Sequence, residues 1–331
     1  MRELKIVAIV AFFSLLTYYL VEPYAHSQMH KHVESHDFVY DGTADVEECA
    51  ASVEKCKAMG IKTNKAEARE SAKKAFWADV KTVASLKGNA AAGEAGFGMC
   101  MGCHNGANMN MGGVIPPNLD HAGAIYDKNY LIALIKDPAM ASNVDHKYAD
   151  TMMHPMGSIK TMFTDNQSIA DVVAYLLEKK SGEITSKEAF EEACMRCHAM
   201  RYAKITQLGD TPKFKYEKDA LTHKIKVIEE QDAVKAYMGK LPPDLSIIIR
   251  ARSEHFLETF VENPQSQLPG TSMPRVGLTH EGYEKVKAYL EEVGDPSKPK
   301  REAVGPWVLG FFFIFTILAY LWKQSQWRDL H

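Results

Sequence analysis

Two five-residue segments of this 331-residue chain repeat one pattern of cysteine and histidine. Cys100-Met101-Gly102-Cys103-His104 and Cys194-Met195-Arg196-Cys197-His198 both read CxxCH, and together they use four of the six cysteines. Two thiols at this spacing can bond both vinyl groups of one porphyrin, and the histidine that follows then reaches the iron. A zinc site would need further Cys or His pairs at ligand spacing, and the sequence offers none. The motifs therefore predict two covalently bound haem c groups.

A pair of prolines follows each motif, in Ile115-Pro116-Pro117-Asn118-Leu119 and in Leu241-Pro242-Pro243-Asp244-Leu245. A histidine that ligates a metal usually donates its other ring N–H to an acceptor, often a backbone carbonyl. Proline has a fixed φ, so its carbonyl is a well-placed acceptor. We expect one proline of each pair to accept from His104 or His198. A simple polyproline turn is the alternative.

An amphipathic helix is expected to close each repeat. After Thr164-Asp165, apolar residues recur with the spacing i, i+3, i+4, i+7, at Ile169, Val172, Val173 and Leu176. After Thr279-His280-Glu281, one helical face carries Tyr283, Val286, Leu290 and Val293. Both helices begin at Thr or Asp caps.

The repetition of motif, proline turn and terminal helix predicts an all-α fold of two tandem class I haem domains. We place the first domain at residues 93–180 and the second at residues 181–296. Residues 25–92 are expected to form a linker and a helical cover.

The sixth iron ligand distinguishes an electron carrier from a catalyst, because a carrier fills both axial positions. Methionine opposite histidine raises the reduction potential. In the second repeat we expect Met273, which lies in the loop before the terminal helix, with Met200 and Met238 as alternatives. In the first repeat we expect Met156, which has the corresponding position. The alternatives there are Met152, Met153, Met162, His146 and His154.

The two ends of the chain are apolar. Residues 6–21 are uncharged and would form about 24 Å of helix, whereas uncharged residues 304–322 would form about 28 Å. A hydrocarbon core is about 30 Å thick. Because Trp307 and Trp322 bracket the second run, we expect a C-terminal transmembrane anchor there.

The N-terminal run follows the basic residues Arg2 and Lys5. Residues 1–24 are therefore expected to be either an uncleaved anchor or a signal segment, in which case Ala25-His26-Ser27 is the cleavage site. In either case, we expect the residues that follow to be exported across the membrane.

Cys49 and Cys56 remain outside the CxxCH motifs. On one unbroken helix they would lie about 10.5 Å apart along the axis. A disulfide needs Cα atoms within about 7 Å, so a bridge requires a bend between them. For an oxidising compartment we expect such a disulfide, with free buried thiols as the alternative.

The composition is that of an ordinary globular protein, with 46% apolar and 24% charged residues. The net charge of −3, from 39 basic and 42 acidic residues, gives no support for nucleic-acid binding. No catalytic triad or paired carboxylates can be recognised. We therefore expect an electron-transfer subunit rather than a catalyst on its own.

Residues 190–331 resemble cytochrome c1, the haem subunit of the bc1 complex (quinol:cytochrome c oxidoreductase). The resemblance rests on four features, which are Cys194 to Tyr202, Leu241 to Ser246 running into Ile249-Arg250-Ala251-Arg252, Met273-Pro274, and the single C-terminal anchor ending in Lys323 to Trp327. It implies that Cys194 and Cys197 hold the ring and that His198 and Met273 are the axial ligands.

Most cytochrome c1 proteins carry one haem, whereas residues 93–180 resemble an additional class I domain, similar to one half of a dihaem c4-type cytochrome. The chain thus looks like a dihaem cytochrome c1 of epsilonproteobacterial bc1 complexes. This resemblance implies haem domains on the periplasmic side of the bacterial inner membrane. It also implies a dimeric complex with cytochrome b and the Rieske iron–sulfur protein.

The expected function is a two-haem relay. The Rieske protein would give one electron to the haem held by His198 and Met273. The electron would pass to the haem held by His104 and Met156, and then to a downstream cytochrome or oxidase. One alternative is the dihaem subunit of a cbb3-type oxidase, which would not need the C-terminal anchor. A dihaem peroxidase and a free membrane-anchored shuttle are the others.

Overall fold

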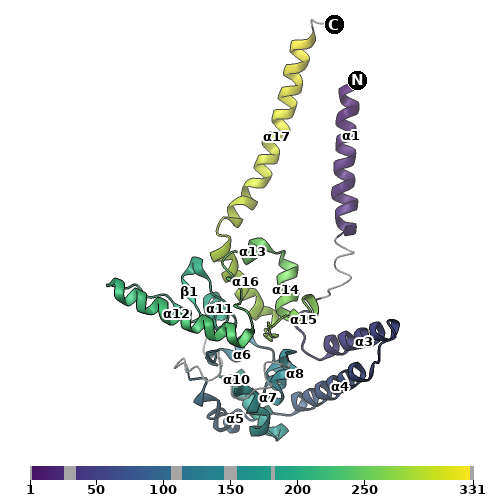
Figure 1. Ribbon diagram of the computed structural model, residues 1–331. Coiled ribbons are helices and arrows are strands. Elements are labelled where there is room, and N and C mark those ends of the chain that lie inside the picture. Colours follow the sequence, from purple (N-terminus) through teal and green to yellow (C-terminus); the bar gives the residue numbers. More distant parts are fainter. Residues whose placement is uncertain (1, 26–34, 106–113, 145–154, 180–182, 329–331) are drawn as a thin grey trace.

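The computed structural model describes residues 2–25, 35–105, 114–144, 155–179 and 183–328. These residues are mostly helical, as predicted (Figure 1). Within them, the one sheet is an antiparallel hairpin of β1 (Ile205–Thr206) and β2 (Gly209–Asp210). Ile205 pairs with Asp210, and Thr206 pairs with Gly209. Strands of two residues are too short for an alternating apolar pattern, so the sequence did not indicate them.

In chain order, the helices of residues 25–92 (the cover) precede those of the two segments that contain the CxxCH motifs (the first and second repeats). The cover contains α3 (Thr43–Ala58) and α4 (Asn64–Ser85). The first repeat contains α5 (Ala90–Phe97), η2 (Cys100–Gly102), α6 (Ala122–Ile125), α7 (Lys128–Lys136), α8 (Pro138–Ser142), η4 (Pro155–Ser158), α9 (Ile159–Met162) and α10 (Asn166–Glu178). The second contains α11 (Ser186–Ala193), η5 (Arg201–Ala203), α12 (Glu217–Met238), α13 (Ile248–Ala251), α14 (Glu254–Glu262), α15 (Pro264–Gln267) and α16 (His280–Gly294).

The two predicted terminal helices are confirmed as α10 and α16. The side chain of Asp165 caps α10 by accepting from the backbone N–H of Ser168, and Thr279 caps α16 by accepting from that of Gly282. Their predicted apolar faces are turned into the core. In each repeat the terminal helix packs against the helix that precedes the CxxCH motif, α10 against α5 and α16 against α11. The helix pair therefore recurs along with the sequence motifs.

Helices α5 and α10 approach with their backbones nearly in contact at Gly93. A Cβ atom at this position would lie 2.0 Å from the carbonyl oxygen of Asp171, which belongs to the rigid backbone of α10. We expect Gly93→Ala to lower the free energy of unfolding by about 1–3 kcal/mol, because the two helices must separate. Denaturant titration of the full-length protein measures this effect. Ala92→Ser on the exposed side of α5 is the control, and equal stability of the two variants would contradict the close approach.

The two repeats share one hydrophobic core. Ile125 and Ile132 from the first repeat belong to the same buried cluster as Phe190 and Tyr283 from the second. The backbones are also joined, because the N–H of Thr279 donates to the carbonyl of Ile125 at 2.7 Å. The repeats therefore pack as one body.

Helix α4 packs against α7 and α10 and buries Trp77, Val80 and Val83. Helix α3 packs on α4 and is unbroken from Thr43 to Ala58. Cys49 and Cys56 both lie on this continuous helix as free thiols. The predicted disulfide between them is therefore wrong, since the required bend is absent from α3.

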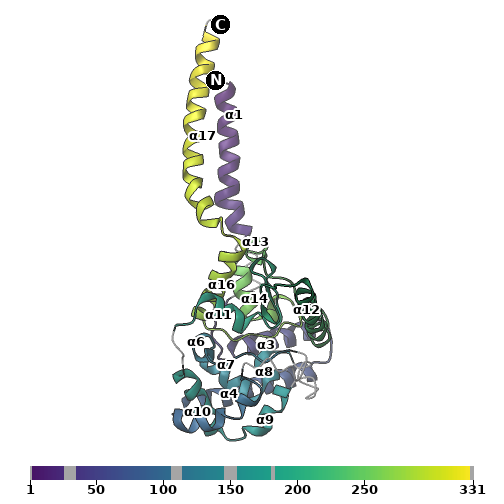
Figure 2. The same cartoon turned by 90° about the vertical axis from the view of Figure 1, so that its left-hand side faces the viewer.

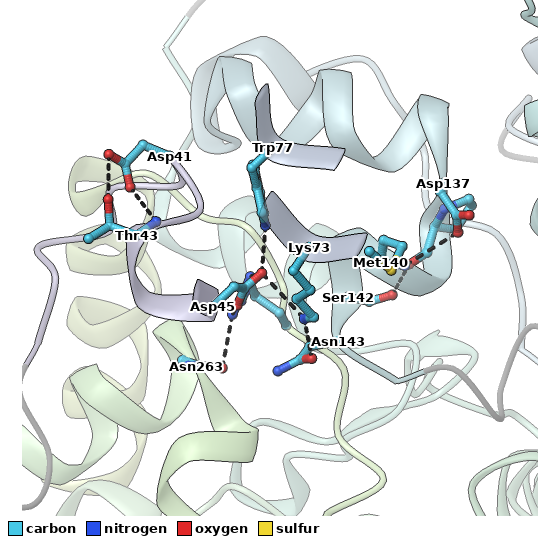
Figure 3. A network of polar contacts seen from close by, with 12 residues as sticks. Asp41, Thr43, Asp45, Lys73, Trp77, Asp137, Met140, Ser142, Asn143 and Asn263 are labelled. Carbon is cyan, nitrogen blue, oxygen red and sulfur yellow. Dashed lines mark hydrogen bonds and ion pairs between the residues drawn. The ribbon is translucent and has the colours of Figure 1, made fainter. Parts of the chain in front are cut away.

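A buried cluster of charged and polar side chains joins the cover to both repeats (Figure 3). Asp45 of α3 is its centre and is only 1% exposed. The carboxylate accepts from Trp77 Nε1 at 2.7 Å and from Arg275 Nη2 at 2.5 Å, and Lys73 Nζ lies 3.4 Å away. Burial alone would raise the pKa of Asp45, but the charges of Arg275 and Lys73 and the hydrogen bonds outweigh it and lower the pKa to about 2.

This lowered pKa predicts a specific loss of stability in acid. The ionised form of Asp45 stabilises the fold fully above its ordinary pKa of 3.8, and the contribution is lost as the pH falls through about 2. A difference of nearly two pKa units corresponds to about 2 kcal/mol. Between about pH 4 and pH 2, the wild type should therefore lose about 2 kcal/mol of unfolding free energy that Asp45→Asn does not lose, because asparagine has no carboxylate to protonate. Parallel stability curves for the two proteins would contradict the prediction.

Two long apolar helices project from the same side of the globular part (Figures 1 and 2). The first is α1 (Arg2–Leu16), which continues through the π-helical turn η1 (Thr17–Val21). The second is α17 (Lys298–Trp327). Among the described residues, Leu4–Ala25 and Lys298–Trp327 are long and apolar enough to cross a membrane, and neither is buried in the protein. Both contain the predicted apolar runs and are compatible with membrane association.

Candidate haem-binding sites

The two CxxCH motifs form the same backbone turn. In the first motif, the N–H groups of Cys103 and His104 both donate to the carbonyl of Cys100, at 3.1 and 2.9 Å. In the second, those of Cys197 and His198 donate to the carbonyl of Cys194, at 3.2 and 3.0 Å. The second turn begins directly after α11 ends, and the first begins at Cys100, shortly after α5 ends at Phe97. The turns thus bring two cysteines and one histidine together in each repeat.

Each motif histidine is held by the second proline of the pair that follows it. His104 Nδ1 lies 2.8 Å from the carbonyl oxygen of Pro117, and His198 Nδ1 lies 2.8 Å from that of Pro243. Because a carbonyl only accepts, Nδ1–H must be the donor, and this leaves the lone pair of Nε2 free for a metal. The expectation that a proline carbonyl orients each histidine is confirmed.

The surroundings of both histidines favour their neutral form. Burial lowers the pKa of His104, and the positive charge of Arg196 lowers it further, against the opposing effect of the Pro117 carbonyl. Burial likewise lowers the pKa of His198. Neutral imidazole is the form that ligates a metal, so both side chains are suited to bind iron.

A cavity of about 390 Å³ lies beside the first motif. Cys100, Cys103, His104 and Met156 all line it, so the structure brings together the four predicted haem-binding residues of the first repeat. This volume lies within the range of about 300–1,000 Å³ that is usual for cofactor pockets. Most of the other lining residues are apolar, among them Phe97, Ile115, Leu131, Leu134, Phe163 and Leu176. The residues present therefore fit a haem group.

The methionines of the first repeat differ in their placement. Met156 lies in η4, is partly buried and packs against the hydrophobic core. Met162 also lines the cavity, but it is 54% exposed. The remaining alternatives, Met152, Met153, His146 and His154, lie outside the described residues.

The second motif is joined to its proline turn by backbone contacts. The N–H of Leu245 donates to the carbonyl of Ala199 at 2.9 Å, and the N–H of Arg201 donates to Asp244 Oδ2 at 3.1 Å. Tyr202 N–H donates to Ser246 Oγ at 3.1 Å. These contacts fix the chain on both sides of the His198–Pro243 hydrogen bond.

The methionines of the second repeat also differ. Met200 is completely buried in the hydrophobic core, and Met238 is buried at the end of α12. Met273 is partly buried in an irregular segment just before Pro274, and its carbonyl accepts from Gln265 Nε2 at 3.4 Å. Met273 therefore keeps the loop position in which it was predicted, whereas the side chain of Met200 is fully enclosed by the core.

Residues from both repeats meet between the two motifs. Tyr126 lines the first cavity, and its hydroxyl lies 3.5 Å from the carbonyl of Glu192, two residues before Cys194. The carboxylate of Glu192 lies 2.5 Å from His121 Nδ1. Burial raises the pKa of Glu192, although His121 opposes the shift. No sequence motif marked these residues, because they become neighbours only when the repeats pack together.

Comparisons with known proteins agree with the motifs. Residues 90–180 match the family model described as cytochrome c. The chain is 25% identical over 190 residues to the ammonia monooxygenase gamma subunit of Nitrosomonas europaea, covering 44% of this chain and 81% of that protein. It is 23% identical over 202 residues to cytochrome c1 of Allochromatium vinosum, covering 43% of this chain and 82% of that protein. No solved structure matches significantly. The chain thus contains a cytochrome c domain and is distantly similar to cytochrome c1.

Proposed function

We propose that this chain is a membrane-anchored dihaem c-type cytochrome and the cytochrome c1-like subunit of a quinol:cytochrome c oxidoreductase (bc1 complex). The observation that carries the proposal is the repeated geometry, in which each CxxCH histidine is held at 2.8 Å by a proline carbonyl. The cytochrome c domain and the similarity to cytochrome c1 support a role in electron transfer.

The site residues have distinct roles in this proposal. The cysteines hold two haems through thioether bonds, Cys100 and Cys103 for the first, Cys194 and Cys197 for the second. His104 and Met156 would ligate the iron of the first haem, and His198 and Met273 that of the second. Each haem supplies a one-electron redox couple when bound. With two protein ligands, each iron would exclude substrates and exogenous ligands, and a methionine ligand would favour a high reduction potential.

The contacts between the repeats support an electron relay. Tyr126 lines the cavity of the first site and lies next to the segment that leads into Cys194. Since the second repeat resembles cytochrome c1, we place the Rieske protein and cytochrome b on its side. The first repeat then faces the downstream cytochrome or oxidase.

The two exposed apolar helices support a membrane anchor at each end of the chain. Because both project from one side of the globular part, the two haem sites stand together on one side of the bilayer (Figures 1 and 2). We assign this side to the periplasm of a bacterial inner membrane, within a dimeric complex.

Purification of the tagged full-length chain from native membranes in mild detergent tests this function. The proposal predicts that a Rieske protein and cytochrome b copurify with it, identified by peptide mass spectrometry. Copurification with a copper-containing oxidase core would instead identify a subunit of a cbb3-type oxidase. Isolation as a lone subunit would indicate a free shuttle, and peroxide turnover at an open iron would indicate a peroxidase.

A further inference from the structure

Arg275, which follows Met273 by two residues, is fixed to the first repeat through its backbone. Its N–H donates to the carbonyl of Ser142 at 3.0 Å, and its carbonyl accepts from the hydroxyl of Tyr130 at 2.6 Å. Ser142 ends α8 and Tyr130 belongs to α7. The segment that follows Met273 is thus attached to helices outside its own repeat.

The guanidinium of Arg275 is held by the helical cover, through the carboxylate of Asp45. Nη2 and Nη1 donate to the two oxygens of Asp45 at 2.5 and 3.3 Å, and Nη2 also donates to Asn263 Oδ1 at 3.1 Å. Such a two-point contact between arginine and a carboxylate fixes orientation as well as distance. Asp45 and Arg275 are 1% and 4% exposed, so water does not compete for the contact.

Asp45 is itself immobilised by α4. Trp77 Nε1 donates to its Oδ2 at 2.7 Å, and Lys73 Nζ lies 3.4 Å from the same oxygen. Lys73 also donates to Asn143 Oδ1 at 2.6 Å (Figure 3). The carboxylate therefore has a fixed position between two helices of the cover.

We propose that Asp45 is a positioning residue for the second haem site and that it holds Met273 in place through Arg275. Only Pro274, whose φ is fixed, separates Met273 from Arg275. The position of the guanidinium is therefore transmitted to the methionine. This inference rests on the proposed role of Met273 as an iron ligand. It gives the helical cover a function in tuning the haem of the second repeat.

Asp45→Asn in the full-length, haem-loaded protein tests the proposal, because it keeps the shape of the side chain and removes its charge. We expect the apparent affinity of the ferrous second haem for carbon monoxide to rise about tenfold, which corresponds to about 1.4 kcal/mol in the equilibrium between bound and detached methionine. The sulfur-to-iron charge-transfer band should weaken, and the midpoint potential of one haem should fall. The first haem should keep its spectrum.

Lys136→Met is the control. Lys136 also joins the cover to the first repeat, since its amine lies 2.7 Å from Asp79 Oδ2 and donates to Asn166 Oδ1 at 2.8 Å, but it lies outside the Asp45 cluster. Its loss should lower stability and leave carbon monoxide binding and potential unchanged. Arg275→Lys keeps the positive charge but lacks the planar fork of the guanidinium. It should therefore raise the affinity for carbon monoxide as Asp45→Asn does, and it tests the proposal even if Asp45→Asn does not fold.

The proposal is overturned if Arg275→Lys and any folded Asp45→Asn protein bind carbon monoxide as the wild type does. It is also overturned if Lys136→Met opens the second iron equally. Met273→Ala, prepared in parallel, separates this failure from that of the ligand assignment. If Met273→Ala leaves both irons closed to carbon monoxide, Met273 is not a ligand and the proposed function is at fault.

Discussion

Replacing Met273 with alanine is expected to open the second haem iron to exogenous ligands. The proximal side remains intact, because His198 keeps its hydrogen bond to Pro243 at 2.8 Å. The ferrous protein should then bind carbon monoxide at one of its two irons. The midpoint potential of that haem should fall by on the order of 100 mV. At 59 mV per tenfold, this corresponds to a change of nearly two powers of ten in the ratio of ligand affinities of the ferrous and ferric iron.

Met200→Leu is the control for this prediction. Met200 is completely buried in the core, and leucine has a similar volume, so the substitution should cost less than about 1.5 kcal/mol. Both irons should remain six-coordinate in this variant. The assignment of Met273 fails if Met200→Leu opens an iron and Met273→Ala does not. Spectral titration with carbon monoxide and redox potentiometry provide both readouts.

The second large effect is expected from Met156→Ala in the first repeat. Met156 lines the cavity that contains Cys100, Cys103 and His104, and it packs against the hydrophobic core. Its loss should open the first iron to carbon monoxide and lower the potential of that haem by a similar amount. The second haem should be unaffected.

Met162→Ala is the matched variant, because Met162 lines the same cavity but is 54% exposed. It should leave the absorption spectrum and both potentials as in the wild type. If Met162→Ala opens the first iron and Met156→Ala does not, Met162 is the ligand and the assignment of Met156 is wrong. If neither substitution opens the iron, the ligand must be sought among Met152, Met153, His146 and His154.

The haem motifs and their supporting elements could be predicted because their signals are local. CxxCH, the proline pairs and the amphipathic faces of α10 and α16 each span a few consecutive turns of chain. The carbonyl of Pro117 follows His104 closely in the sequence. For His198, the repeat predicted an acceptor in the pair Pro242-Pro243 but not which of the two prolines it is. The helix caps at Asp165 and Thr279 could also be predicted, because a cap residue bonds only to the first turn of its own helix.

The contacts between distant segments could not be predicted in this way. Asp45 and Arg275 are 230 residues apart, and neither belongs to a motif. His121, Glu192 and Tyr126 become neighbours only through the packing of one repeat on the other. The disulfide prediction failed for a related reason, because cysteine content indicates pairing but the continuity of α3 forbids it.

The repeat pattern also could not predict that the two repeats share one hydrophobic core. Internal repetition indicated two units, but it contained no information on how they pack. The backbone hydrogen bond from Thr279 to Ile125 and the close approach of Gly282 to the carbonyl of Ile125 join the start of α16 to α6. The second repeat therefore depends on the first for the placement of its terminal helix.

The mass of the intact, denatured polypeptide tests the central claim most directly, because thioether-bound haem survives unfolding whereas a haem held only by axial ligands is released. The account predicts that the mature chain is heavier than its polypeptide by two haem groups. A mass increase of one haem, or of none, would contradict it.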